Sequence, residues 1–124
     1  MASVLLVDDD SYLLSGLRRS LREQPYELFT ANSTETAIQM FQRQPFDVVV
    51  VDQNMGGRLG TELIAWVSSH FPDTVRIMLT GATDMWVAQE AVNNGGVFRF
   101  MTKPCLPLDL ALAIHEGLEA QSKV

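Results

Sequence analysis

The chain has 124 residues, of which 47% are hydrophobic and 19% are charged, and its formal net charge is −6 at pH 7. A chain of this size and apolar content can bury one core, so we expect a single globular domain and not a disordered segment. The acidic balance argues against direct nucleic-acid binding, and no apolar run approaches the ~18 residues that a membrane span needs.

The N-terminal half predicts three strands and two helices. The strand Val4–Val7 leads to a helix in which leucines recur at helical spacing. The strand Glu27–Ala31 leads to a helix that we expect Asn32 to cap, with Glu35 as its capping-box partner. The strand Val48–Val51 is β-branched on both faces, which is typical of a strand buried between two helical layers.

The C-terminal half continues the same alternation. A helix over Thr61–His70 stops before a proline, which cannot continue a helix readily. The remaining predicted elements are the strand Val75–Leu79, the helix Asp84–Asn93, the strand Val97–Met101 and the helix Pro107–Ala120. Because strand and helix alternate throughout, we expect an α/β fold: a doubly wound parallel sheet with helices on both faces, built as one domain over residues 1–124.

Polar residues follow four of the predicted strands. The first strand ends in Asp8-Asp9-Asp10, the third in Asp52 and the fourth in Thr80, and Lys103 follows the fifth. Sites in such sheets form beyond the carboxyl ends of the strands, so these side chains should meet. Two carboxylates ~4 Å apart repel by about 4 kcal/mol at a near-surface dielectric, so the aspartates must be neutralised, be partly protonated, or point apart into water.

This set of groups predicts phosphoryl-transfer chemistry. Clustered carboxylates suit Mg²⁺, and a carboxylate beside that ion can attack phosphorus to give an aspartyl phosphate. The metal and a lysine would neutralise the oxygens of the transferring group. A hydroxyl such as that of Thr80 can donate a hydrogen bond to the new phosphoryl oxygen.

The chain resembles the receiver domain of bacterial two-component response regulators over essentially its whole length. The matching motifs are "VDDD", "VVVVDQNMGGRLG", "MLTGA" and "FRFMTKP", in order and at the right strand ends. The resemblance implies a five-stranded (βα)5 flavodoxin-like sheet of order 2-1-3-4-5. It also implies a cytoplasmic signalling switch, phosphorylated by a sensor histidine kinase, that catalyses only its own phosphorylation and dephosphorylation. The single cysteine, Cys105, fits a reducing compartment.

The resemblance also implies a role for each site residue. Asp52 would be the phosphoacceptor, with Thr80 and Lys103 contacting the phosphoryl group and a cis peptide bond following the lysine. The Mg²⁺ ligands would be Asp8 (mainly through water), Asp9, Asp52 and the backbone carbonyl of Asn54. Asp10 has no equivalent role, and we expect it to cap the first helix, alone or with Ser11.

Two departures from the family pattern concern motion. The loop after the phosphoacceptor contains Gly56-Gly57 where the family usually has a proline, so we expect that loop to be more mobile. The resemblance implies two switch residues, Thr80 and an aromatic residue in the fifth strand. The aromatic residue is Phe100 in this chain, whereas the family frequently has tyrosine at that position. Because it has no hydroxyl, packing alone must drive any in–out motion.

The predicted fifth helix is apolar nearly all round in its first turns. A helix of this kind often has a second contact surface. We therefore expect the face made by helix 4, strand 5 and helix 5 to mediate homodimerisation or to dock an output domain, with Leu110 as the test position. The apolar residues are Leu108, Leu110, Ala111, Leu112, Ala113, Ile114 and Leu118.

Other interpretations stay open at this stage. Asp8-x-Asp10 also resembles the first motif of Mg²⁺-dependent phosphohydrolases of the haloacid dehalogenase type, but that interpretation leaves Asp52 without a role. A receiver-like adaptor that works without phosphorylation would have lost residues of the phosphorylation site. Here the five key residues of that site are all present: Asp8, Asp9, Asp52, Thr80 and Lys103. The chain could be a stand-alone receiver or the N-terminal part of a longer regulator, and its motifs look closer to receivers that precede enhancer-binding activators or cyclic-dinucleotide phosphodiesterases.

Overall fold

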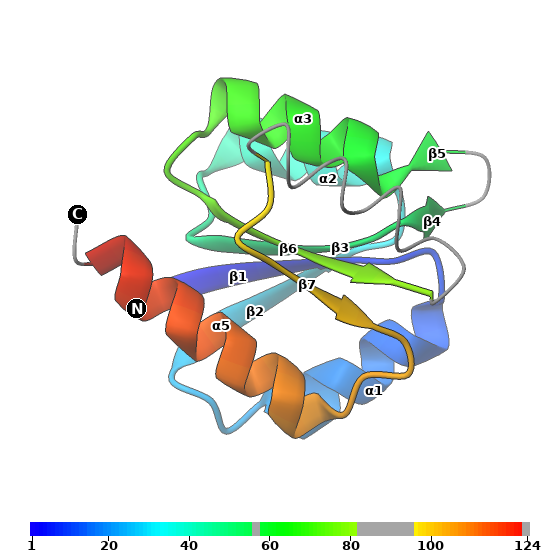
Figure 1. The fold of residues 1–124 in the computed structure, drawn as a ribbon, viewed down its shortest axis with the longest axis vertical. Helices are drawn as coiled ribbons and strands as arrows, with labels where there is room; N and C mark the ends of the chain where they lie inside the picture. The colour runs from blue at the N-terminus through cyan, green and yellow to red at the C-terminus, as the bar shows by residue number, and fades with distance from the viewer. Residues whose placement is uncertain (56–57, 82–95, 123–124) are drawn as a thin grey trace.

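The structure of the protein, a computed structural model, describes residues 1–55, 58–81 and 96–122. Strands and helices alternate along the chain (Figure 1). In chain order they are β1 (Ala2–Val7), α1 (Ser11–Leu21), β2 (Tyr26–Ala31), α2 (Thr34–Arg43), β3 (Val48–Asp52), β4 (Asn54–Met55), β5 (Arg58–Leu59), α3 (Gly60–His70), β6 (Val75–Thr80), β7 (Arg99–Thr102) and α5 (Pro107–Ser122).

Five of the strands form one parallel sheet in the order β2-β1-β3-β6-β7. Since β6 and β7 are the fourth and fifth strands of this sheet, the expected order 2-1-3-4-5 is confirmed. Helices α1 and α5 cover one face of the sheet, and α2 and α3 cover the other (Figure 1). β4 and β5 pair separately as a short antiparallel ribbon, which the sequence did not predict.

The two faces of the sheet bury alternate residues of the same strands. In β1, Val4 and Leu6 join the cluster beneath α1 and α5, whereas Leu5 and Val7 join the cluster beneath α2 and α3. The valines of β3 divide in the same way, and all of them are buried. This two-residue period is what a strand covered on both sides requires, and it fixes the register that brings the strand ends together.

The helix starts differ from expectation in one case. Ser33, not Asn32, caps α2: Ser33 has extended backbone angles, and its Oγ accepts the backbone N–H of Thr36. A cap must lie outside the first helical turn with its oxygen within reach of the N2 or N3 amide, and Ser33 meets both conditions. The asparagine prediction was therefore one residue too early.

Several element boundaries also differ. The fifth sheet strand spans Arg99–Thr102 instead of Val97–Met101, and α5 runs two residues beyond Ala120. The predicted helix Asp84–Asn93 and the loop glycines Gly56-Gly57 lie outside the described residues.

Helix α5 is apolar on both sides, but Leu110 is not on its free face. Leu110 is 1% exposed and belongs to the core, so it was the wrong test position for a contact surface. Leu108 and Leu112 are 79% and 58% exposed, and Leu106 just before the helix is exposed as well. The second apolar surface is therefore made by these three leucines.

Candidate functional site

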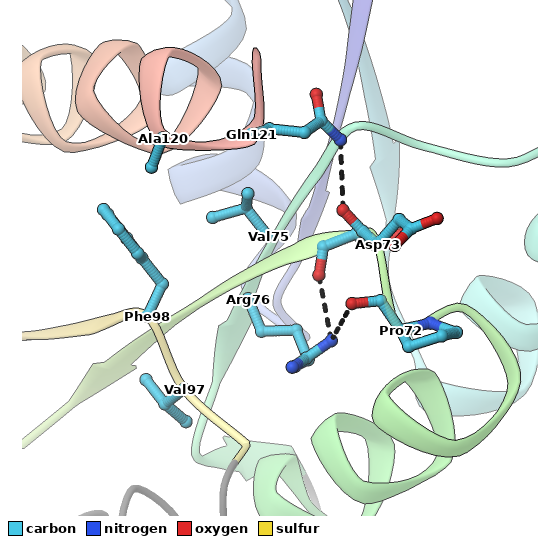
Figure 2. Close-up of a pocket in the computed structure, with 9 residues that line it drawn as sticks. Pro72, Asp73, Val75, Arg76, Val97, Phe98, Ala120 and Gln121 are labelled. Carbon is cyan, nitrogen blue, oxygen red and sulfur yellow. Dashed lines mark hydrogen bonds between the residues drawn. The ribbon is translucent and has the colours of Figure 1, made fainter. Parts of the chain in front are cut away.

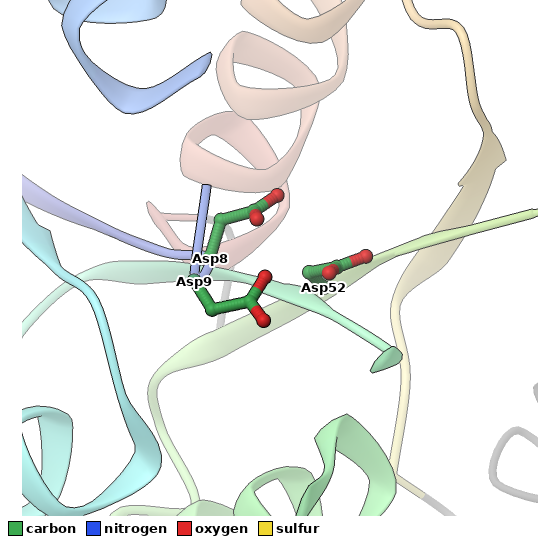
Figure 3. A group of neighbouring side chains, drawn as sticks. All are labelled: Asp8, Asp9 and Asp52. Carbon is green, nitrogen blue, oxygen red and sulfur yellow. The ribbon is translucent and has the colours of Figure 1, made fainter. Parts of the chain in front are cut away.

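Three aspartates meet at the carboxyl edge of the sheet. Asp8 and Asp9 follow β1, and Asp52 ends β3; each offers a carboxylate oxygen, and these oxygens all lie within 4.8 Å of one another (Figure 3). Asp8 is 3% exposed and Asp52 5%, whereas Asp9 is exposed. β1 and β3 are hydrogen-bonded neighbours in register, which is why residues 44 positions apart share one site.

Lys103 is the cation of this cluster. Its Nζ lies 3.1 Å from Asp8 Oδ2 and 2.9 Å from Asp52 Oδ1. The lysine follows β7, and its backbone N–H donates to the carbonyl of Thr80, 2.9 Å away, at the end of β6. The Lys103–Pro104 peptide bond is cis, as the resemblance implies. One ammonium thus lies between two buried carboxylates.

The cluster perturbs the titration of its members. Burial raises the pKa of Asp52, and the negative charges of Asp8 and Asp9 raise it further, while Lys103 opposes them. Burial alone would lower the pKa of Lys103, but its hydrogen bonds to Asp52 and Asp8, together with the negative charges of these two aspartates, outweigh that effect and raise it. The three negative groups therefore exceed the single positive one, and the site favours a further cation.

The third aspartate has a different partner. Asp10 Oδ1 accepts the backbone N–H groups of Tyr12 and Leu13, both at 3.1 Å, and so caps α1 as expected. Its own backbone N–H donates to Asp8 Oδ1 at 2.9 Å. Asp10 thus stabilises the helix start and helps to orient Asp8.

The other predicted site residues lie on β6, β4 and β7. Thr80 is fully buried at the end of β6, and its hydroxyl donates to the carbonyl of Gly81. Asn54 begins β4, two residues after the phosphoacceptor candidate Asp52. Phe100 lies in β7, partly buried against the cluster beneath α2 and α3.

Gln53 is a polar residue that the sequence reasoning missed. It directly follows Asp52, is 2% exposed, and its side-chain Oε1 accepts the backbone N–H of Thr61 at 3.1 Å. A signal was available: a polar side chain directly after a wholly buried strand must find a hydrogen-bond partner.

The family of this chain follows from comparison with known proteins. Residues 4–115 match the model of the response regulator receiver domain. The chain belongs to the response regulator receiver family. The strand order and the motifs at the strand ends agree with this assignment, and the receiver is a signalling domain of response regulators.

Curated relatives of this receiver are transcriptional regulators. It is 35% identical over 97% of its length to the hydrogenase transcriptional regulatory protein HoxA of Cupriavidus necator, and 35% identical over 95% to the transcriptional regulatory protein GlrR of Escherichia coli. These matches cover 25% and 26% of the relatives, so the receiver spans about a quarter of their length.

Solved structures give the same fold. A receiver domain from Clostridium thermocellum superposes with a TM-score of 0.91 at 27% identity, covering 98% of both chains. A structure described as an adenylate cyclase from Rhodopirellula baltica gives a TM-score of 0.92 at 42% identity, covering 96% of this chain and 88% of that one.

The aspartate cluster suits a hard divalent cation. Its three carboxylates supply only oxygen ligands and carry more negative charge than Lys103 balances, which is the donor chemistry that Mg²⁺ prefers. The residues present therefore fit the metal that receivers typically bind.

A separate cavity of about 560 Å³ lies at the opposite edge of the sheet (Figure 2). Arg76 borders it and donates to the backbone carbonyls of Pro72 and Thr74, while Gln121 donates to the carbonyl of Asp73. These bonds join the start of β6 to the end of α5. The polar side chains of this cavity thus hold the loops in place.

Within the described residues, no helix is both long enough and apolar enough to cross a membrane.

Proposed function

We propose that this receiver is a phosphorylation switch in which Asp52 accepts a phosphoryl group from a sensor histidine kinase. The observation that carries the proposal is the position of Lys103, whose Nζ contacts both Asp8 and Asp52 while Asp9 completes the carboxylate cluster. The unit that carries this function is residues 1–124, either alone or at the N-terminus of a longer cytoplasmic regulator.

In the transfer step, a carboxylate oxygen of Asp52 attacks phosphorus. A phosphorus–oxygen bond forms to Asp52, and the bond to the donor's nitrogen or oxygen breaks with its electron pair leaving on the donor. Asp8, Asp9, Asp52 and the backbone carbonyl of Asn54 would hold Mg²⁺, which when bound neutralises phosphoryl oxygens. Lys103 is already within 3 Å of Asp52, so it can pair with the new phosphoryl group without a large movement.

The switch would follow from the loss of the Lys103–Asp52 pair. The new phosphoryl oxygens compete for the lysine and for the hydroxyl of Thr80, which now donates to the carbonyl of Gly81. Lys103 and Thr80 are joined through the backbone at the ends of β7 and β6, so a change at one reaches the other. Phe100, the second residue of β7, would then repack, and the face made by helix 4, strand 5 and helix 5 would report the change.

A phosphohydrolase of the haloacid dehalogenase type is the second candidate. It would use Asp8 as the nucleophile, with Asp10 as the acid–base residue. Here Asp10 is engaged by two backbone N–H groups of α1 and Asp8 is bound by Lys103 and the amide of Asp10, an arrangement that favours a structural Asp10.

Intact-mass measurement separates these candidates. The chain is incubated with Mg²⁺ and acetyl phosphate, and we expect the gain of one phosphoryl group, lost in Asp52→Asn and retained in Asp10→Ser. A hydrolase would instead turn over many equivalents of donor and fail on Asp8→Asn. A receiver-like adaptor would do neither, and an unmodified wild-type chain would contradict the proposal.

The relatives support a proposal about the partners of the switch. HoxA and GlrR are named as transcriptional regulatory proteins, of which a receiver of this length makes up about a quarter. We propose a kinase as donor and an output domain or a second receiver as the recipient of the signal, with no direct nucleic-acid contact by this domain.

A further inference from the structure

We infer that Gln53 is a positioning residue for the metal site, because it fixes both the phosphoacceptor before it and the proposed carbonyl ligand after it. The inference rests on the proposed function, since it concerns how Asp52 and Asn54 are presented to a divalent cation.

Gln53 is bonded to two different elements. Its backbone N–H donates to the carbonyl of Leu79 in β6 at 2.9 Å, and its backbone carbonyl accepts the N–H of Gly60 at 2.8 Å. Its side-chain Oε1 accepts the N–H of Thr61 at 3.1 Å. Because an N–H can only donate, the group that faces Thr61 must be the amide oxygen.

These bonds replace the N-cap side-chain acceptor that helix α3 lacks; at the same helix start the side chain of Glu62 accepts the backbone N–H of Leu59 at 3.3 Å. The residue at the N-cap position is Leu59, whose side chain cannot accept a hydrogen bond. Gln53 accepts the first two N–H groups of α3, one with its backbone carbonyl and one with its side chain. The start of α3 is thus attached to the residue directly after Asp52.

The start of α3 also lies very close to the backbone of Asp52. A Cβ placed on Gly60 would lie 2.3 Å from the carbonyl oxygen of Asp52, so α3 begins in contact with the backbone of the phosphoacceptor. Both peptide units that flank Gln53 are held, one by β6 and one by α3. The directions in which the Asp52 side chain and the Asn54 carbonyl leave this segment are therefore set together.

The test is Gln53→Met, which keeps the length of the side chain and removes the acceptor. Outer contacts that orient metal ligands typically contribute 10–100-fold to metal affinity. We expect Mg²⁺ to bind about tenfold more weakly to this variant, by calorimetric titration well below its melting temperature.

A second substitution separates positioning from helix capping. Leu59→Ser gives α3 a hydroxyl of its own at the N-cap, and amide exchange at Thr61 reports whether that hydroxyl protects the first turn. The double variant Gln53→Met/Leu59→Ser should bind Mg²⁺ as weakly as the single Gln53 variant, whereas Leu59→Ser alone should bind like wild type.

The outcomes are distinguishable from failure of the proposed function. Wild-type affinity in Gln53→Met, or its recovery in the double variant, would reduce Gln53 to a helix cap and overturn the inference. Absence of Mg²⁺ binding by the wild-type chain would instead overturn the proposed metal site itself.

Discussion

At the scale of single residues, three consecutive aspartates have three different environments. Asp8 is buried and bound to Lys103, Asp9 is exposed at the edge of the cluster, and Asp10 caps α1. This division limits their mutual repulsion, because only two of the three carboxylates point into the shared site with Asp52. A run of like charges is tolerable here because each member has its own neighbours.

Tyr26 supports a prediction about alkaline pH. It is buried in the core, its hydroxyl has no hydrogen-bond partner among the described residues, and burial raises its pKa to about 12. The folded state therefore holds this proton more tightly than the unfolded state does, so stability is fully present below pH 10 and falls as pH rises toward about 12. We expect Tyr26 to account for a loss of about 2 kcal/mol over that interval.

Tyr26→Phe removes both the proton and the unpaired hydroxyl. The variant should match or exceed wild-type stability at pH 7, by up to about 1 kcal/mol, and should lose less stability between pH 10 and 12. Urea unfolding followed by circular dichroism at several pH values measures both effects. Identical alkaline losses in the two proteins would show that Tyr26 does not titrate differently on folding.

The sequence predicted most of the side chains that meet in the candidate site, but not the residues that hold them in place. Asp8, Asp52 and Lys103 could be named because motifs at strand ends converge in a parallel sheet whatever the details of packing. Gln53 and Ser33 could not, because their roles depend on which backbone N–H group comes within hydrogen-bond reach. That distance is set by loop geometry, which side-chain patterning does not encode.

At the scale of elements, two glycines contrast the start of α3 with the middle of α1. Gly60 has no room for a Cβ, because the carbonyl oxygen of Asp52 would lie 2.3 Å away, whereas nothing lies within 4 Å of a Cβ on Gly16. Gly60→Ala should destabilise the fold by roughly 2–3 kcal/mol, as overpacking does. Gly16→Ala should stabilise it by roughly 0.5–1 kcal/mol, because alanine is the better helix former.

The melting temperatures of the two alanine variants, measured by thermal unfolding, check this contrast in stability. Labelling by acetyl phosphate measures the rate of phosphorylation in the same variants. Gly60→Ala should also slow phosphorylation, since the clash displaces the backbone of Asp52, while Gly16→Ala should not. Equal melting temperatures in the two variants would contradict the close approach of α3 to the backbone of Asp52.

Element boundaries were harder to predict than element types. β7 begins at Arg99, where pairing with Ile77 of β6 starts, although the apolar run begins two residues earlier. Pairing with the neighbouring strand decides where a strand begins, and the sequence of one strand does not contain that register. The β4–β5 ribbon was also missed. Each of its strands has only two residues, which is too short for a sequence pattern, so only the pairing between them defines it.

At the scale of the whole molecule, the alternation of strands and helices was enough to predict a parallel sheet with helices on both faces, whereas the strand order came from the family resemblance. Parallel strands need helical crossovers, and right-handed crossovers leave few arrangements for five such units. The site lies at the carboxyl edge of the sheet, whereas the exposed Leu108 and Leu112 belong to α5, which covers the same face of the sheet as α1 (Figure 1). If phosphorylation of Asp52 controls this surface, it therefore acts on residues that the site does not itself include.

The exposed leucines of α5 carry the prediction that concerns this surface. Leu108 and Leu112 point away from the core at 79% and 58% exposure, so Leu112→Asp should change stability by no more than about 0.5 kcal/mol. If the surface binds a second receiver, sedimentation at high concentration with Mg²⁺ and beryllofluoride, a phosphoryl analogue, should show dimers that Leu112→Asp removes. Labelling by acetyl phosphate should be unchanged in the variant.

Leu110→Asp is the contrasting substitution: it places a charge in the core and should unfold the domain. A wild-type receiver that stays monomeric, together with no effect of Leu112→Asp on the activity of a longer parent chain, would mean that the leucines have no role in signalling.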